Sequence, residues 1–262
     1  MDHLTRWIDR SASFRISALD ASQSSHLLAI LHDVVGDHAT GLAQAVSGAL
    51  LLASDLKSGQ TISLQMEVLD RIYYADATAE GLVRAKSAAR GATSEVALAK
   101  VRRLGEGGVH YQSIAEAPAR TVQAILQAFM DQSEQLPSWL DLPVELGASG
   151  LPDKVRGAWL RGFPTTALDQ LTALDASWKA RGAVWDPAAI GTGLSVDTWD
   201  VLARSEIVVF CPCTRERALT ALVALGAESA LDAKAKGEQL EVVCDFCRSA
   251  YSFEPDEVLL AV

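Results

Sequence analysis

Apolar residues recur at helical spacing in three long segments of the first half of the chain. Residues 24–35 and 38–59 are both apolar with this period, and Gly59 is the expected stop of the second helix. Residues 119–137 carry Val122, Ile125, Leu126 and Phe129 on one helical face. Three helices are therefore predicted before residue 140.

A second pattern, with period two, predicts strands between and after these helices. Over 61–68, apolar residues alternate with polar ones, which is typical of a half-buried strand. The strand pattern continues over 71–78 and 81–89, with Gly81 at the turn, and two further strands are expected to flank the Gly- and Pro-containing "SGLPD". Helices and strands are interspersed without a regular βαβ rhythm, so an α+β core domain is predicted.

The pattern changes after Pro164. Helices are predicted over 165–182 and 195–205, with a turn-rich loop between them, and Trp159, Trp178, Trp185 and Trp199 all fall near this stretch. A segment so rich in tryptophan is not a solvated linker and is expected to lie against other structure. Two interpretations stay open: ordinary peripheral core helices, or an apolar surface that is exposed only under some conditions.

Composition narrows the class of protein. The chain has 262 residues, is 49% hydrophobic and carries a net charge of −10, which fits a globular protein and disfavours nucleic acid and anionic membranes as partners. The N-terminus has no apolar signal-peptide core, and no apolar run is long enough to span a membrane. A cytoplasmic location is expected, where clustered cysteines are more often metal ligands or redox groups than static disulfides.

All four cysteines lie in the last fifth of the chain. Cys211, Cys213, Cys244 and Cys247 form the pattern C-x-C-x30-C-x2-C. The two short motifs can each supply two thiolates to a tetrahedral zinc ion, and the five histidines all lie far upstream, so an all-sulfur site is predicted. Closing the intervening loop costs about 3 kcal/mol, whereas zinc binding to such peptides supplies roughly 10–16 kcal/mol.

Residues 206–262 have too little core to fold without that metal. A thioredoxin-type centre would place the C-x-x-C motif at a strand-to-helix turn. Here "CDFC" follows the strand-like "LEVV" and leads into "AYSF", which predicts a hairpin and argues against such a centre.

The chain resembles the heat shock protein 33 family of redox-regulated, ATP-independent holdase chaperones. The most specific part is "CPCTRERALTAL" followed by "CDFCRSAYSFEPDEV", and the likeness extends to "ALLLASDLKSGQTISLQ" and "FMDQSEQLPSWL". In two places the sequence departs from the family. After "VRRLGEGG" the chain reaches "VHYQS" almost at once, which suggests a shortened strand or hairpin, and Ser113 replaces the usual glycine after Tyr-Gln.

The resemblance implies a redox switch and no enzymatic activity. One zinc per chain would be held by the four cysteines in the reduced, inactive form. Oxidation would release it and form the disulfides Cys211–Cys213 and Cys244–Cys247. The implied domains are a chaperone core (1–164), a metastable helical linker (165–205) and a small zinc-binding domain (206–262). Unfolding of the last two would expose surface for unfolding client proteins, and the oxidised form would dimerise.

The candidate client-binding residues lie in the linker. They are Leu171, Leu174, Trp178, Trp185 and Trp199. Two other classes of function remain open: a constitutive zinc-ribbon adaptor for protein interactions, which would keep its metal under oxidant, and a thiol–disulfide oxidoreductase.

Overall fold

The computed structural model describes residues 1–10, 14–134, 137–164 and 199–261, together with the isolated positions Asp169, Thr172, Ala173 and Ala176. The chain forms two compact units, a core unit (Met1–Val209) and a C-terminal unit (Phe210–Val262). The predicted helix 165–182 falls almost entirely outside the described residues.

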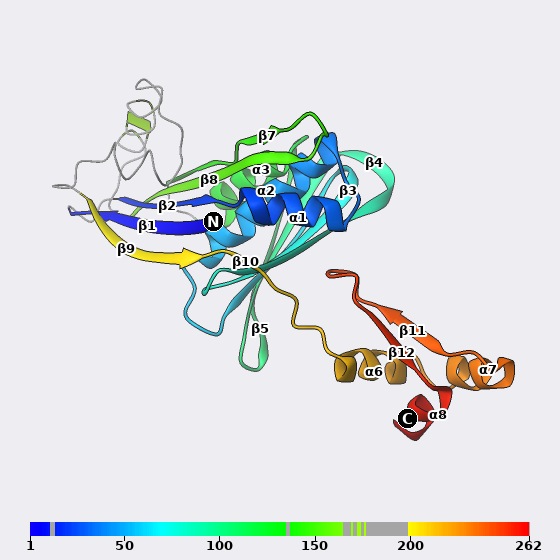
Figure 1. The fold of residues 1–262 in the computed structure, drawn as a ribbon. Helices are drawn as coiled ribbons and strands as arrows, with labels where there is room; N and C mark the ends of the chain where they lie inside the picture. Colours follow the sequence, from blue (N-terminus) through cyan, green and yellow to red (C-terminus); the bar gives the residue numbers. More distant parts are fainter. Residues whose placement is uncertain are drawn as a thin grey trace. The chain divides into compact units, whose positions relative to one another are not determined.

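The first sheet of the core unit is antiparallel and brings the N-terminus beside residues from late in the chain. Its strands follow the order β6-β8-β2-β1-β9, with β7 paired to β8 (Figure 1). Their bounds are β1 His3–Asp9, β2 Phe14–Asp20, β6 Ser138–Asp141, β7 Val144–Leu146, β8 Pro152–Gly162 and β9 Trp199–Glu206. The strands expected around "SGLPD" are thus confirmed, while β1 and β2 were not predicted.

The second sheet is built on two long strands. β3 (Thr61–Thr78) and β4 (Leu82–Gly105) form an antiparallel hairpin, and β5 (Gly108–Pro118) pairs with the far end of β4. The predicted turn at Gly81 is confirmed: its φ of +92° suits glycine. The two-residue strand β10 (Val208–Val209) runs parallel to β4.

Helix α2 (Gly36–Ala53) lies between the sheets and is buried on almost every side. A helix that is apolar all round, like this one, is suited only to the centre of a core. Helix α1 (Ser22–Leu31) packs on β8, and α3 (Val122–Phe129) continues into a π-helical turn over Met130–Glu134. Three helices were predicted in these regions, and all three are present.

The end of α2 corrects the expected stop at Gly59. The helix ends at Ala53 because the next two residues are held by the first sheet. Ser54 accepts a hydrogen bond from Arg6 at its carbonyl oxygen, and Asp55 forms ion pairs with Arg15 and Arg161. Tertiary contacts therefore end the helix six residues before the glycine that the sequence suggested.

The predicted helix over 195–205 is wrong for the part that the structure describes. Trp199–Glu206 is strand β9, which pairs antiparallel with β1 from Asp9↔Trp199 to His3↔Glu206. The open edge of β1 supplies backbone partners that no local pattern reveals, and such pairing overrides helical propensity.

One face of the first sheet carries a second apolar cluster, here called the outer-face cluster. Helices α1 and α2 pack against the opposite face, which contributes Leu19 and Trp159 to the main core. The buried members of the outer-face cluster are Trp7, Ile16, Ala18, Ala158 and Leu160, with Phe14, Trp139 and Trp199 half-buried beside them. Every one of these residues belongs to a strand of this sheet.

The C-terminal unit has its own small core. Its elements are α6 Arg215–Ala224, α7 Glu228–Lys236, β11 Leu240–Val243, β12 Ala250–Phe253 and α8 Pro255–Ala261. Only Ala218, Leu222, Ala230, Phe253 and Val258 form the buried cluster of its described residues. Two of the five are alanines, so apolar burial alone supplies little stability.

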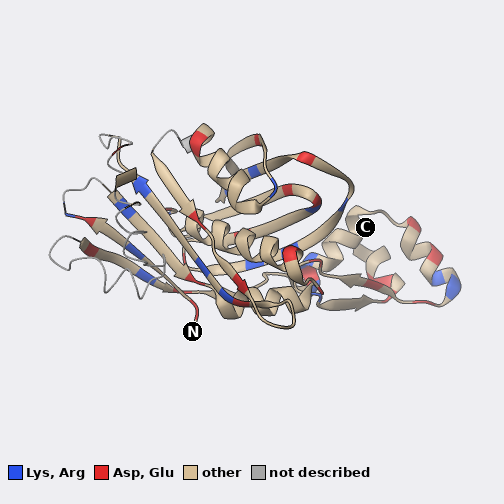
Figure 2. Ribbon diagram, turned by 90° about the horizontal axis from the view of Figure 1, so that it is seen from above, with Lys and Arg blue, Asp and Glu red and all other residues tan. Residues whose placement is uncertain are grey.

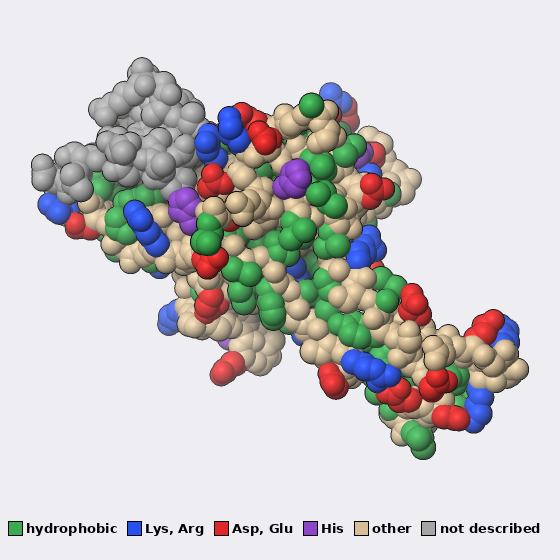
Figure 3. Space-filling view, in the orientation of Figure 1, with side chains coloured by type: hydrophobic (Ala, Val, Ile, Leu, Met, Phe, Trp, Pro, Cys, Tyr) green, Lys and Arg blue, Asp and Glu red, His purple; other side chains and the backbone are tan. Residues whose placement is uncertain are grey.

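No large area of a single charge sign is seen among the described residues on the face in view. Acidic and basic residues both occur along the described elements (Figure 2), and in the space-filling view they lie among apolar side chains (Figure 3). Within the described ranges, none of the helices combines the length and apolarity needed to cross a membrane.

Candidate metal centre

The structure brings all four predicted cysteines together. Their sulfur atoms lie within 4.8 Å of one another, and each side chain is half-buried. The Sγ atoms of Cys211 and Cys244 are 3.8 Å apart, and those of Cys213 and Cys247 are 3.1 Å apart. Residues more than thirty positions apart in the chain thus form one cluster of sulfur atoms.

The C-x-C half of the cluster sits at the start of a helix. Residues 211–214 lead into α6, whose N-cap Thr214 has an extended backbone and accepts a hydrogen bond from the Arg217 backbone N–H through its side chain. Arg217 also donates to the carbonyl oxygen of Pro212 at 3.0 Å, which holds the residue between the two cysteines in place. The cap of α6 therefore positions this pair.

The C-x-x-C half sits in the hairpin turn that the sequence predicted. β11 and β12 pair from Leu240↔Phe253 to Val243↔Ala250, and the turn between them carries both thiols. The Arg248 N–H donates to the Cys244 carbonyl oxygen at 2.8 Å, and Arg248 has a positive φ of 58°. This tight turn points two sulfurs to one side, and the hairpin disfavours a thioredoxin-type centre.

Two hydroxyl groups contact the sulfur cluster. The Tyr251 hydroxyl lies 3.2 Å from Cys213 Sγ, and the Ser249 hydroxyl lies 3.2 Å from Cys247 Sγ. The sequence showed Tyr251 only as part of a motif and gave no signal for Ser249. Its position two residues after the last cysteine, at the start of a strand, is the feature that could have indicated it.

The thiols hold their protons unequally. The Tyr251 hydroxyl lowers the pKa of Cys213, but the neighbouring thiols, led by Cys247, together with burial raise it to about 12. Burial raises the pKa of Cys247, but hydrogen bonds with Ser249 and with the thiols of Cys213 and Cys244 outweigh burial and lower it to about 6. Cys247 therefore loses its proton more readily than Cys213, and the thiolate is the form of cysteine that binds metals and reacts with oxidants.

The donor set fits a soft, tetrahedral metal ion. Four sulfurs at about 2.3 Å from a central ion would lie roughly 3.8 Å from one another, which is the separation of Cys211 and Cys244. Cys213 and Cys247 would need to move apart by about 0.7 Å to complete the tetrahedron. In the described part of the chain this is the sole group of at least three His, Cys, Asp or Glu residues with such an arrangement.

Only one of the five predicted client-binding residues lies within the described part of the chain. Trp199 lies on β9 and packs, half-buried, against the outer-face cluster. Leu171, Leu174, Trp178 and Trp185 lie outside the described residues. The structure therefore places one of the five on the core sheet itself.

The fold and the site define a class: an α+β protein with a small C-terminal unit whose four cysteines could hold a metal ion, as the sequence predicted. A sequence model of the Hsp33 protein family matches residues 2–254, so the chain belongs to the Hsp33 family.

Individual relatives agree with that assignment. The chain is 26% identical to the 33 kDa chaperonin of Pelobacter propionicus over 98% of its own length and 92% of that protein. It is also 26% identical to the 33 kDa chaperonin of Symbiobacterium thermophilum, covering 98% and 96% of the two chains. The crystal structure of the Thermotoga maritima 33 kDa chaperonin matches with a TM-score of 0.72 at 20% identity, covering 98% of this chain and 97% of that one, which supports the fold. None of these names is that of an enzyme.

Proposed function

We propose that this protein is a redox-regulated, ATP-independent holdase chaperone that is inactive when reduced and metal-bound. The observation that carries the proposal is the gathering of four thiols within 4.8 Å in a unit with a five-residue apolar core. The names of the relatives point to a chaperone. A unit that depends on its metal is a natural switch, because any reaction that removes the metal also removes the fold.

The metal is proposed to be zinc, one ion per chain. Four thiolates form a soft donor set, and four-coordinate sulfur sites of this kind are typical of structural zinc. When bound, the ion would draw the thiol protons off and supply the folding free energy that the small apolar core lacks. Cys211, Cys213, Cys244 and Cys247 would be its ligands.

Oxidation is proposed to convert the four thiolates into two disulfides. Each pair would give two electrons to one molecule of hydrogen peroxide, which takes up two protons and leaves as two waters. Two peroxides per chain would therefore release the zinc ion. The proposed pairs, Cys211–Cys213 and Cys244–Cys247, close the smallest loops, and short loops are favoured once the unit has opened.

Loss of the metal is proposed to expose client-binding surface on the core. Residues 165–198 connect β8 to β9, two strands of the sheet that carries the outer-face cluster. The metastable linker (165–205) begins in this segment, and its opening is proposed to expose apolar surface to clients. Leu171, Leu174, Trp178 and Trp185 would then contact clients from the released segment, and Trp199 would do so from the sheet.

The remaining parts of the proposal concern the setting. Clients would be unfolding proteins of the cytoplasm, and the oxidised chain would form a homodimer. Within the chain, we propose a chaperone core (1–164), a linker (165–205) and a zinc-binding domain (206–262). Only the first part of the linker, 165–198, would open, and β9 (Trp199–Glu206) would stay paired with β1.

A single oxidation experiment separates the candidate functions. Peroxide is added to reduced, zinc-loaded protein while zinc release and light scattering of a thermally unfolding client are recorded. A redox-regulated holdase releases zinc and then suppresses scattering, and dithiothreitol reverses both effects. Zinc retention under oxidant would identify a constitutive adaptor, and catalytic turnover of a disulfide substrate without suppression of scattering would identify an oxidoreductase.

A further inference from the structure

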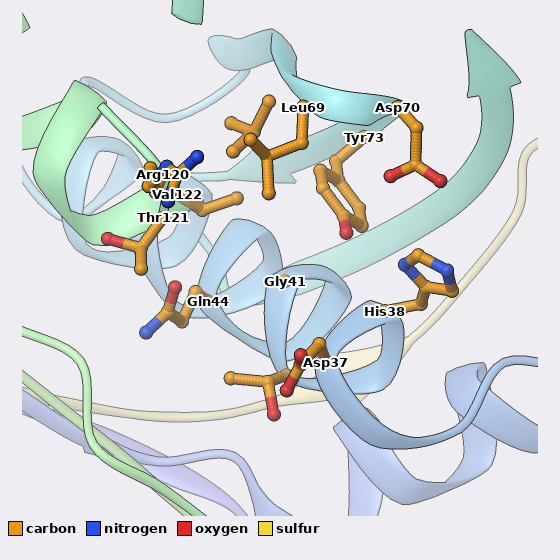
Figure 4. Close-up of a pocket in the computed structure, with 12 residues that line it drawn as sticks. Asp37, His38, Gly41, Gln44, Leu69, Asp70, Tyr73, Arg120, Thr121 and Val122 are labelled. Carbon is orange, nitrogen blue, oxygen red and sulfur yellow. The ribbon is translucent and has the colours of Figure 1, made fainter. Parts of the chain in front are cut away.

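The core unit contains a cavity that the proposed switch does not use. It has a volume of about 400 Å³, is partly open, and is lined by the first turns of α2, the middle of β3 and the residues at the start of α3 (Figure 4). β3 is irregular here: its register with β4 shifts on both sides of Leu69, whose φ is +54°. Leu69 itself lines the cavity.

Tyr73 reaches into the cavity from β3. Its side chain extends toward the first turns of α2 (Figure 4), and its ring lies so close to Gly41 that a Cβ there would collide with it. The residue is only 4% exposed, and its hydroxyl makes no hydrogen bond to the described residues. The hydroxyl oxygen is not one of the fully buried polar atoms, so it faces the space of the cavity and is free to bond to a ligand there.

The charged groups that act on this hydroxyl are two carboxylates and one guanidinium, that of Arg71. Asp37 and Asp70 line the cavity, and both carboxylates raise the pKa of Tyr73, although burial is the larger cause. Arg120 also lines it, but its guanidinium is paired with Glu95 at 2.6 Å. The positive end of the α2 dipole is equivalent to roughly half a charge, which two carboxylates outweigh.

The walls between these polar groups are apolar. Val68, Leu69 and Val122 line the same space, and Val68 and Val122 belong to the main core. A ligand that fits therefore has a cationic end for the carboxylates and the Tyr73 hydroxyl, and a short hydrocarbon stem for the walls. Lysine and arginine side chains have this form, as do small free amines.

We propose that this cavity binds an alkylammonium or alkylguanidinium group, with the Tyr73 hydroxyl accepting a hydrogen bond from the cation and Asp37 and Asp70 supplying the opposite charge. The group can come from a basic side chain of a client or from a free amine. The first source rests on the proposed chaperone function, whereas the second does not.

The charge of Arg71 offers a way to distinguish a cationic ligand from an anionic one. Its charge lies near the Tyr73 hydroxyl and lowers the pKa of Tyr73, the largest effect of any charged neighbour. It is not among the residues that line the cavity. A cationic ligand is repelled by Arg71 and an anionic ligand is attracted, so removing this charge changes the affinity in opposite directions for the two classes.

The test uses the full, reduced and metal-loaded chain labelled for NMR. Butylammonium is titrated at pH 7 while the amide signals of Gly41 and Thr121 are followed, with pentanoate as the anionic probe of similar size. Butylammonium is expected to shift these signals with a Kd on the order of millimolar, as suits so small a ligand. Pentanoate is expected to leave them unchanged.

Variants assign the contacts. Tyr73→Phe is expected to weaken butylammonium binding about tenfold, because the hydroxyl bonds to a charged group. Asp37→Asn and Asp70→Asn should each weaken it about two- to fivefold, and Arg71→Ala should strengthen it about twofold. Asp153→Asn removes the same charge away from the cavity lining and is the matched control. Thermal unfolding of each variant checks that the fold is kept.

Two peptides that differ only by lysine or norleucine distinguish the sources. If the lysine peptide alone shifts the signals, the cavity accepts client side chains, and if only butylammonium does, its ligand is a free amine. The proposal is overturned if butylammonium at tens of millimolar shifts nothing, if pentanoate binds as well, or if binding survives unchanged in Tyr73→Phe and in the double variant Asp37→Asn, Asp70→Asn.

Discussion

At the residue scale, the contacts to the sulfur atoms matter as much as the four cysteines. Tyr251 and Ser249 each place a hydroxyl 3.2 Å from a sulfur, on Cys213 and Cys247 respectively. Groups that bond to metal ligands orient them and tune how strongly they hold the ion. Ser249 directly precedes β12 and Tyr251 lies within it, so the hairpin supplies ligands and their supports together.

The first prediction concerns the metal itself. Reduced protein is expected to contain one zinc per chain by elemental analysis, and the double variant Cys244→Ser, Cys247→Ser should contain none. Two sulfurs cannot supply a closed tetrahedral site. Substituting Ser249→Ala, which leaves all four sulfurs, is the control and should keep stoichiometric zinc. Zinc retained by the double cysteine variant would show that the ion lies elsewhere.

The second prediction concerns Tyr251. Tyr251→Phe should lower zinc affinity about tenfold, because it removes a hydrogen bond to the ligand Cys213 while keeping the ring. Competition with a chromogenic chelator measures the affinity. The same variant should release zinc faster in peroxide, because a sulfur without this hydrogen bond is a stronger nucleophile toward the oxidant. Tyr74→Phe on the core sheet is the matched control, and an unchanged affinity in Tyr251→Phe would contradict the role assigned to the hydroxyl.

The cysteine cluster was predictable because the spacing of the four cysteines is itself typical of a metal site. Two short cysteine motifs and the absence of nearby histidine indicate one all-sulfur site without knowledge of the fold. The hydroxyl contacts were not predictable, because serine and tyrosine near a cysteine are common and only the folded hairpin decides which oxygen reaches a sulfur. The cavity beside Tyr73 was not predictable either, because its lining comes from three elements that only the folded chain brings together.

At the scale of elements, the short segment Glu206–Val209 joins the core unit to the residues of the metal centre. Ile207 is buried in the main core, and its N–H donates to the Asp2 carbonyl oxygen at 3.1 Å. The Val208 N–H donates to the Gly81 carbonyl oxygen at 3.1 Å, beside the β3–β4 turn. The segment is therefore hydrogen-bonded to the core at two points, Asp2 and Gly81.

The third prediction tests this attachment. In Gly81→Ala the new Cβ would collide with the Glu206 carbonyl oxygen, and the residue would also be strained at a φ of +92°. The core should lose about 2–3 kcal/mol, or roughly 4–12 °C in Tm. Gly91→Ala on β4 is the control, since a Cβ there meets nothing within 4 Å. Equal Tm values for the two variants would show that the turn does not hold the segment.

The element predictions succeeded where the pattern is local and failed where it is not. The buried helix α2 and the long hairpin β3–β4 follow directly from their apolar periods. Strand β9 was mistaken for a helix because its partner, β1, is almost two hundred positions earlier. The end of α2 was misplaced because Arg15 and Arg161, from two different strands, hold Asp55.

At the scale of the whole molecule, the two units should respond differently to oxidation. The fourth prediction is that hydrogen exchange after peroxide treatment shows lost protection in Phe210–Val262 and in 165–198, but retained protection in the core. The core has no cysteine, and both of its internal methionines, Met66 and Met130, are fully buried.

Strand β9 makes that measurement decisive. Its amides pair with β1. Trp199–Glu206 should therefore stay protected from exchange, although 165–198 before it and Phe210–Val262 after it lose protection. The thermally treated, reduced protein serves as the comparison, because heat without oxidant leaves the thiols intact. Uniform loss of protection across the chain, or loss in β9 together with the linker, would contradict a core that survives the switch.

The pairing of β1 with β9 also has a consequence for how the chain is made. His3–Asp9 leaves the ribosome early, whereas its partner Trp199–Glu206 follows about 190 residues later. At roughly 5–20 residues per second, that gap lasts on the order of 10–40 s. During this time one edge of β1 lacks a partner, which exposes the nascent chain to aggregation. The metal-binding unit does not face this delay, because its elements all lie within Phe210–Val262 and follow one another closely along the chain.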